Sequence, residues 1–127
     1  MKRLLLHLII PALVATWAVV STSRFEAFSL GMFAAVGILG FLYYSAPHLL
    51  WALVAALSKT SSSICHAGFI AANVALLAIV SLPLLGARDP SGLPMQWVAY
   101  WPFALVLQAL FVAATAAVRA SSSRVGA

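Results

Sequence analysis

Four long apolar stretches alternate with short polar breaks along the chain. The apolar stretches cover residues 4–21, 27–57, 62–85 and 95–118, and the breaks contain "STSRFE", "SKTSS" and "GARDPSGLP". The stretches are continuous rather than alternating, and about 20 apolar residues suffice for a helix to cross a membrane. The pattern predicts four transmembrane helices, with an outer loop over 86–94 and a flexible tail over 119–127.

The second stretch is too long for a straight span. As one helix, residues 27–57 would extend about 46 Å, against a hydrocarbon core of about 30 Å. Pro47 lacks the amide that would bond the carbonyl of Tyr43, so we expect a kink near 43–47. The alternative is a span that ends at Pro47, with the following residues lying along the surface. Those residues have no polar face, so we favour a tilted, kinked helix that continues to Leu57.

Composition supports a membrane protein. Of 127 residues, 65% are hydrophobic and 7% are charged, and the mean hydropathy is +1.10. The fold class expected is therefore all-α, a polytopic four-helix membrane bundle forming a single domain over 1–127. The net charge of +5 comes from basic residues scattered at the ends of segments. Scattered charges indicate contact with the lipid bilayer and no nucleic-acid partner.

Basic residues also predict the orientation. With four helices, one side holds five basic residues and the other side two, Arg24 and Arg88, each beside an acidic residue. The positive side is expected to be cytoplasmic, so both termini should be cytoplasmic, in an inner bacterial membrane. A cleaved signal peptide at the N-terminus is the alternative, although Trp17 occupies a position where cleavage favours a small residue. An outer aromatic belt should comprise Trp17, Trp97, Tyr100 and Trp101.

Polar residues inside the predicted helices form two groups. His48, Asn73 and Gln108 each lie 11 residues from a cytoplasmic helix end, about 16 Å deep, and Tyr44 lies one turn from His48. This polar mid-membrane layer would either fix helix register through hydrogen bonds or line a site for a polar solute, a proton or a quinone headgroup.

The second group lies nearer the cytoplasmic ends of the helices. His7, Cys65 and His66 are possible metal ligands, but their spacing matches no known metal motif and no carboxylate lies nearby to orient an imidazole. Interfacial polar anchors are the simpler interpretation. We expect no cofactor.

Small residues spaced four apart form stripes on three of the predicted helices. Such stripes let helix backbones approach closely in lipid. The stripe residues are Gly31 and Ala35; Ala67, Ala71 and Ala75; and Ala109, Ala113 and Ala117.

Catalytic patterns are missing from the sequence. Glu26 and Asp89 are the only acidic residues and lie in different connections, and no nucleophile-elbow, zinc-protease or phosphate-loop motif occurs. We therefore expect a non-enzymatic accessory or assembly subunit that packs beside a membrane-protein partner. A homo-oligomeric permease or channel, and metal, haem or quinone binding through the histidines, are the alternatives.

Overall fold

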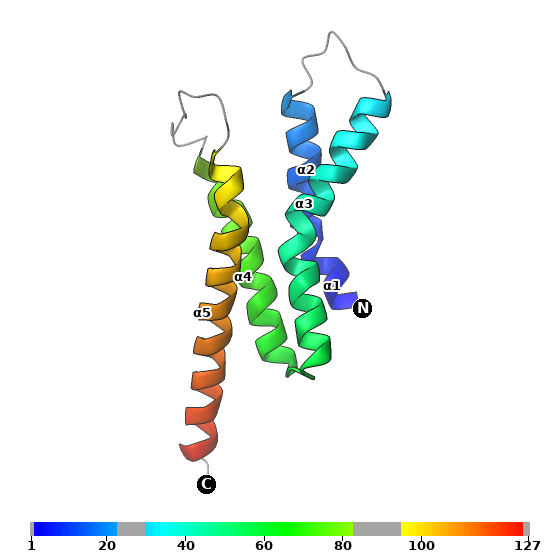
Figure 1. Cartoon of the computed structure of the whole chain (residues 1–127). Helices are drawn as coiled ribbons and strands as arrows, with labels where there is room; N and C mark the ends of the chain where they lie inside the picture. The colour runs from blue at the N-terminus through cyan, green and yellow to red at the C-terminus, as the bar shows by residue number, and fades with distance from the viewer. Residues whose placement is uncertain (1, 23–29, 83–94, 126–127) are drawn as a thin grey trace.

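The computed structural model describes residues 2–22, 30–82 and 95–125, and every regular element in this part of the chain is helical. The helices are α1 (Lys2–His7), α2 (Ile9–Thr22), α3 (Leu30–Leu57), α4 (Ser62–Ser81) and α5 (Met95–Val125). Figure 1 shows α1 and α2 running up, α3 down, α4 up and α5 down, with α4 between α3 and α5. Both termini lie toward the end of the molecule that carries the turn between α3 and α4.

Three helices are long and apolar enough to cross a membrane. Their apolar parts are Ala34–Leu57, Ser62–Ser81 and Val98–Ser123, and a shorter apolar helical stretch covers Leu4–Val20. The first predicted span is thus shorter than the other three. The expected starting residues 27–29, the expected end of the third helix at Leu85 and the loop over 86–94 lie outside the described residues.

The first predicted helix is broken at Leu8, which separates α1 from α2. Pro11 explains the break, because it has no N–H to donate to the carbonyl of His7 one turn earlier. Leu8 still donates to Leu4, and Ala12 to Leu8, so the backbone bonds resume on both sides of the missing one. The continuous helix expected over 4–21 is therefore two helices, with α1 a short separate piece.

α3 continues through Pro47 to Leu57 as one helix and changes direction near its middle (Figure 1). Pro47 cannot donate to the Tyr43 carbonyl, and α5 provides a donor there. Trp101 Nε1 donates to the Tyr43 carbonyl at 3.2 Å, and the Tyr100 hydroxyl donates to the Tyr44 carbonyl at 2.9 Å. The proline bend in α3 is thereby bound to α5.

A tight turn joins α3 to α4. Lys59 has a φ of 49°, in the left-handed region that usually favours glycine. The amide of Thr60 donates to the Ala55 carbonyl at 3.0 Å, and the amide of Lys59 to that of Ala56 at 3.4 Å. This pattern is a Schellman motif, which satisfies the last carbonyls of α3 and reverses the chain.

α5 extends to Val125 rather than ending near Val118. The polar residues 119–125, expected as part of a flexible tail, are therefore helical. Serine hydroxyls in this part bond back to the helix: those of Ser121 and Ser122 to the Val118 carbonyl, and that of Ser123 to the Ala120 carbonyl. Such bonds let serine remain in a helix without a tertiary partner.

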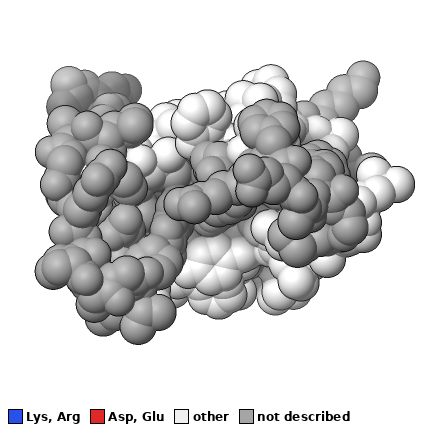
Figure 2. Space-filling view, turned by 90° about the horizontal axis from the view of Figure 1, so that it is seen from above, with Lys and Arg blue, Asp and Glu red and all other residues white. Residues whose placement is uncertain are grey.

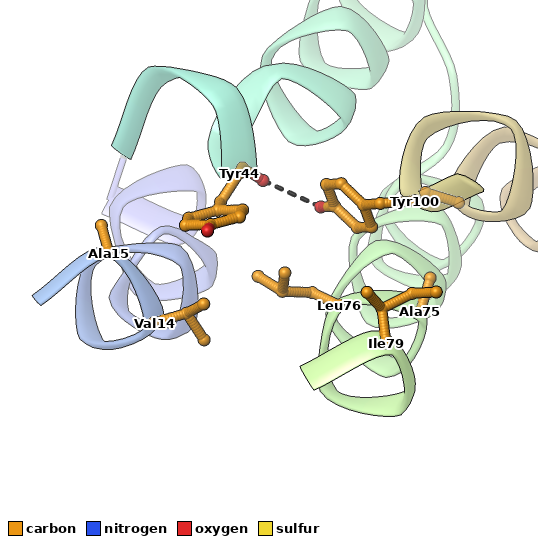
Figure 3. Packing of buried hydrophobic residues seen from close by; sticks show 8 residues of the cluster. Val14, Ala15, Tyr44, Ala75, Leu76, Ile79 and Tyr100 are labelled. Atoms are coloured by element: carbon orange, nitrogen blue, oxygen red, sulfur yellow. Dashed lines mark hydrogen bonds between the residues drawn. The ribbon is translucent and has the colours of Figure 1, made fainter. Parts of the chain in front are cut away.

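The main apolar core lies where α2, α3, α4 and α5 meet. Leu76 of α4 is fully buried between Tyr44 of α3 and Tyr100 of α5, as Figure 3 shows. The other buried members of this cluster are Val14, Ala15, Ala75, Ile79 and Ala104. Alanines at the contacts let the helices approach closely enough for the two tyrosines to reach across.

Candidate functional site

All three histidines of the chain gather in one cluster between α1, α3 and α4. His48 Nε2 lies 2.8 Å from Oδ1 of Asn73, and Nδ2 of Asn73 lies 3.4 Å from Nδ1 of His7. The ring of His7 stacks on Phe69 at a centroid distance of 5.0 Å and meets the ring of His66 edge-on at 4.8 Å. Asn73 on α4 thus connects a histidine of α3 with a histidine of α1. We call His7, His48, His66 and Asn73 the histidine cluster.

The Asn73 amide determines which imidazole nitrogens carry protons. Its oxygen accepts and its nitrogen donates, so His48 must present N–H at Nε2 while His7 presents a lone pair at Nδ1. Turning the amide over exchanges these two roles and preserves both bonds. In either case one histidine facing Asn73 donates and the other accepts.

Two nitrogens of the cluster are enclosed without a partner. His7 Nε2 is buried and makes no hydrogen bond to any described residue. His48 Nδ1 is also buried, and its interaction with the Tyr44 backbone does not reach hydrogen-bond geometry. Buried nitrogen atoms normally have partners, and an exception commonly marks a functional position or a bound small molecule. The cluster therefore has unused hydrogen-bonding capacity inside an apolar interior.

The described surroundings of the cluster contain no negatively charged side chain. The described segments contain neither aspartate nor glutamate, because Glu26 and Asp89 both lie outside them. Figure 2, which views the molecule from the end opposite the α3–α4 turn, likewise shows no charged side chain among the described residues on that face. A protonated imidazole in the cluster would have no described carboxylate beside it.

One member of the cluster opens to the outside. His66 is half-buried and lines a hollow of about 670 Å³. The other lining residues are Leu6, Ser62, Ser63, Ala67, Ile70 and Thr115. Arg119 of α5 hydrogen-bonds to Ser61 and Ser63 beside this hollow. His66 therefore connects the polar end of the molecule with the enclosed His7.

The residues of the predicted polar layer do not all meet. His48 and Asn73 are hydrogen-bonded, but Gln108 is bound to backbone instead: its Nε2 donates to the carbonyl of Pro47 at 3.2 Å and to that of Gly68 at 3.3 Å. Tyr44 contributes its backbone carbonyl to Tyr100. The structure instead adds His7, which the sequence analysis had assigned to a separate group.

The three residues considered as metal ligands do not form a ligand set. His7 and His66 are in ring contact, but no three histidine, cysteine or acidic side chains in the described part of the chain are placed so that they could hold one metal ion. Cys65 is a half-buried free thiol whose backbone carbonyl accepts a 2.9 Å bond from Trp51 Nε1. The cluster is therefore a hydrogen-bonded and ring-stacked group.

Gly68 is a structural residue that the sequence analysis missed. A Cβ atom at this position would overlap the Trp51 indole, which lies directly against the α4 backbone. The absence of a side chain brings α3 close enough for the Trp51–Cys65 bond, one turn from the histidine cluster. A glycine in the middle of an apolar helix was the available signal, because it is unfavourable there unless close packing requires it.

The predicted aromatic belt is divided between surface and interior. Trp17 is exposed on α2, Trp101 is partly exposed, and the side chain of Trp97 lies outside the described residues. Tyr100 is fully buried, because its hydroxyl reaches between helices to Tyr44. Trp101 also lines an apolar groove of about 410 Å³ between α3 and α5, beside the bend at Pro47.

The three stripes of small residues have different surroundings. The α4 stripe is buried: Ala67, Ala71 and Ala75. The stripes on α3 and α5 are exposed: Gly31, Ala35, Ala109, Ala113 and Ala117. Among the described residues, the α4 stripe alone is used for packing within the chain.

No protein-family model matches the chain, and no curated protein or solved structure is similar to it at a significant level. The functional argument therefore depends on the geometry of the chain itself.

Proposed function

We propose that this chain is a non-enzymatic membrane protein that acts as an accessory or assembly subunit, by packing an exposed helix face against a partner in the membrane. The observation that carries the proposal is the exposure of α5. In the most apolar 18 residues of α5 only 11% are buried, against 50% in the corresponding part of α4. An apolar helix with so little internal packing has most of its surface available to lipid or to another helix.

The exposed stripe on α5 is the proposed contact. Ala109, Ala113 and Ala117 lie along one side of the helix, and all three are exposed. The buried stripe on α4 has the same spacing and already supports close helix contact within the chain. The stripe on α5 offers a second helix the same small surface. The partner is another membrane protein or a second copy of this chain.

We place the chain in the inner membrane of a bacterium, with both termini in the cytoplasm. The basic residues support this orientation, because Lys59 lies in the turn between α3 and α4 and Arg119 hydrogen-bonds to Ser61 at the start of α4. Figure 1 shows α1 and the end of α5 toward the same end of the molecule as this turn. Cysteine accessibility from each side of the membrane tests the orientation directly. A cysteine at Lys59 should react with a membrane-impermeant reagent only after the cytoplasmic side is opened.

Native mass spectrometry of gently extracted protein tests the packing proposal. The chain should leave the membrane in an assembly of fixed ratio. Ala113→Leu should dissociate this assembly, because the larger side chain keeps the partner helix away. Ala114→Leu is the matched control, since it adds the same atoms at an exposed neighbouring position outside the stripe. A folded chain that always leaves alone would contradict the proposal.

A second candidate is a small homo-oligomeric permease or channel. The hydrogen-bonded His48, Asn73 and His7 favour it, because polar groups inside apolar helices commonly mark a path for a solute or a proton. Under this alternative His48→Ala and Asn73→Ala abolish flux into vesicles while protein levels remain normal. A purely structural cluster instead predicts lower stability and no flux in either variant or in the unaltered protein.

A further inference from the structure

We propose that the histidine cluster is a proton-binding site that holds α1 against α3 and α4 when neutral and releases it when protonated. The burial of His7 is the main observation that supports this proposal. Among the described side chains of α1, only His7 is buried; Leu5 and Leu6 are exposed and Leu4 is half-buried. The attachment of α1 to the rest of the molecule therefore depends mainly on this imidazole.

The hydrogen bonds of the cluster can accommodate one added proton but not two. The histidine that donates to the Asn73 oxygen keeps its bond when its second nitrogen is protonated. The histidine that accepts from the Asn73 nitrogen loses its lone pair on protonation, and an N–H then faces an N–H. Protonation of both His7 and His48 therefore breaks the connection between α1 and α3 through Asn73.

The groups facing the cluster do not stabilise a positive charge. From α4 the facing group is His66, whose ring contacts that of His7, and from α3 it is Tyr44, one turn from His48. From α5, Arg119 carries a positive charge beside the hollow that His66 lines. α2 has no titratable side chain over Ile9–Thr22. On α5, Tyr100 approaches through its bond to Tyr44. An enclosed imidazolium with no described carboxylate nearby is costly, so protonation favours a conformation that exposes His7.

The fold provides both a route for the proton and a part that moves. His66 lines the hollow beside Ser63 and contacts the His7 ring, so a proton from outside reaches the cluster there first. The break at Leu8 separates α1 from α2, and the helical bond to the His7 carbonyl is missing because of Pro11. α1 can therefore turn away without unwinding α2.

Distance measurements between spin labels test the proposal. In a Cys65→Ala background reconstituted in nanodiscs, one label pair is placed at Leu5→Cys on α1 and Val118→Cys on α5, both exposed positions. The control pair joins Leu39→Cys on α3 to Val118→Cys. Between about pH 8 and about pH 5, where histidine titrates, the α1 pair should change from one narrow distance to a mixture while the control pair stays narrow. The displaced population should rise by up to about tenfold per pH unit for each proton taken up.

Two substitutions separate this mechanism from general acid sensitivity. Asn73→Asp supplies a carboxylate that accepts from both histidines when they are protonated, so α1 should stay attached at acid pH. His7→Phe retains a ring that stacks on Phe69 and has no nitrogen to protonate, so its distance distribution should not depend on pH. The proposal is overturned if the α1 pair is unchanged by acid in the unaltered cluster. It is also overturned if the acid response persists in His7→Phe, or if the control pair broadens equally.

Discussion

Helices α4 and α5 have nearly the same apolar character and contrasting surroundings. The mean hydropathy of their spans is 2.0 and 1.9, and both carry alanines at every fourth position. Half of the most apolar 18 residues of α4 are buried, whereas only 11% of the corresponding part of α5 is. Small residues therefore permit close packing without determining which helix is central. In this chain α4 packs against helices on several sides, and α5 packs mainly against one.

The two helices also differ in how they are attached. α4 contributes a continuous buried side and exchanges contacts with α1, α3 and α5. α5 packs along α4 through one side, which includes Tyr100 and Ala104, and hydrogen bonds add a few polar attachments. These join Tyr100 and Trp101 to α3, Gln108 to α3 and α4, and Arg119 to the start of α4. Substitutions on α4 should therefore reduce folding stability, and substitutions on the exposed side of α5 should affect association.

The largest contrast is expected for the same substitution in the two stripes. Ala71 is fully buried on α4, and Ala71→Leu inserts three carbon atoms into a packed contact. We expect it to lower the free energy of unfolding by about 3 kcal/mol. Ala113→Leu on α5 should change it by less than about 0.5 kcal/mol. Reversible unfolding in bicelles measures both. Equal effects would mean that the α5 stripe is also internal.

The contact between Gly68 and Trp51 provides the next test. Gly68→Ala forces the Trp51 indole away from α4 and removes its bond to the Cys65 carbonyl, which should cost about 2 kcal/mol of unfolding free energy. In a Trp51→Ala background the same change should cost much less, because the added methyl group has space. Additive losses across this double-mutant cycle would contradict the role assigned to Gly68.

Gln108 tests the polar attachment of α5. Gln108→Leu keeps a side chain of similar length and removes the donor to the carbonyls of Pro47 and Gly68. We expect a loss of about 1 kcal/mol, typical of a hydrogen bond between helices in a membrane. Thr115→Val is a control, since its hydroxyl bonds within its own helix to the Phe111 carbonyl. A loss no larger than that of the control would mean that Gln108 does not fix the position of α5.

The smallest effect is expected in the turn between α3 and α4. Lys59 adopts a left-handed conformation that glycine reaches without strain. Lys59→Gly should raise the free energy of unfolding by about 0.5 kcal/mol, after allowance for the greater freedom of glycine in the unfolded chain. Thr60→Gly is the matched comparison and should be destabilising. A lower stability for Lys59→Gly would show that its side chain contributes more than its backbone costs.

The sequence predicts the helical class, the apolar stretches and the continuation of α3 past Pro47 to Leu57. These depend on local hydrophobicity and on backbone chemistry. The sequence pattern does not predict the break at Leu8, although Pro11 is the local cause of this break. The apolar run looks the same whether or not one backbone hydrogen bond is missing. The helical end of α5 was also missed, since serine and arginine resemble a polar tail unless their bonds back to the helix are known.

The histidine cluster shows what can and cannot be predicted from the distance of a residue to the end of its helix. Counting residues from helix ends gave His48, Asn73 and Gln108 the same depth, and the first two are hydrogen-bonded. The same counting separated His7 from them, because it treated the first helix as straight and said nothing of how helices are rotated. The rotation of each helix about its own axis and the position of α1 depend on packing between segments that are distant in the sequence. The spacing of residues along the chain carries no information about this packing.

α5 is longer than a helix needs to be to cross a bilayer core. Its 31 residues extend about 46 Å, while a bilayer core is about 30 Å thick. Figure 1 shows its C-terminal end reaching well beyond the α3–α4 turn. Arg119 hydrogen-bonds to Ser61 and Ser63 at the start of α4, and this is the last described hydrogen bond between the two helices along α5 before the extension. The part of α5 that follows Arg119 is therefore a helical extension that continues past the end of the other helices.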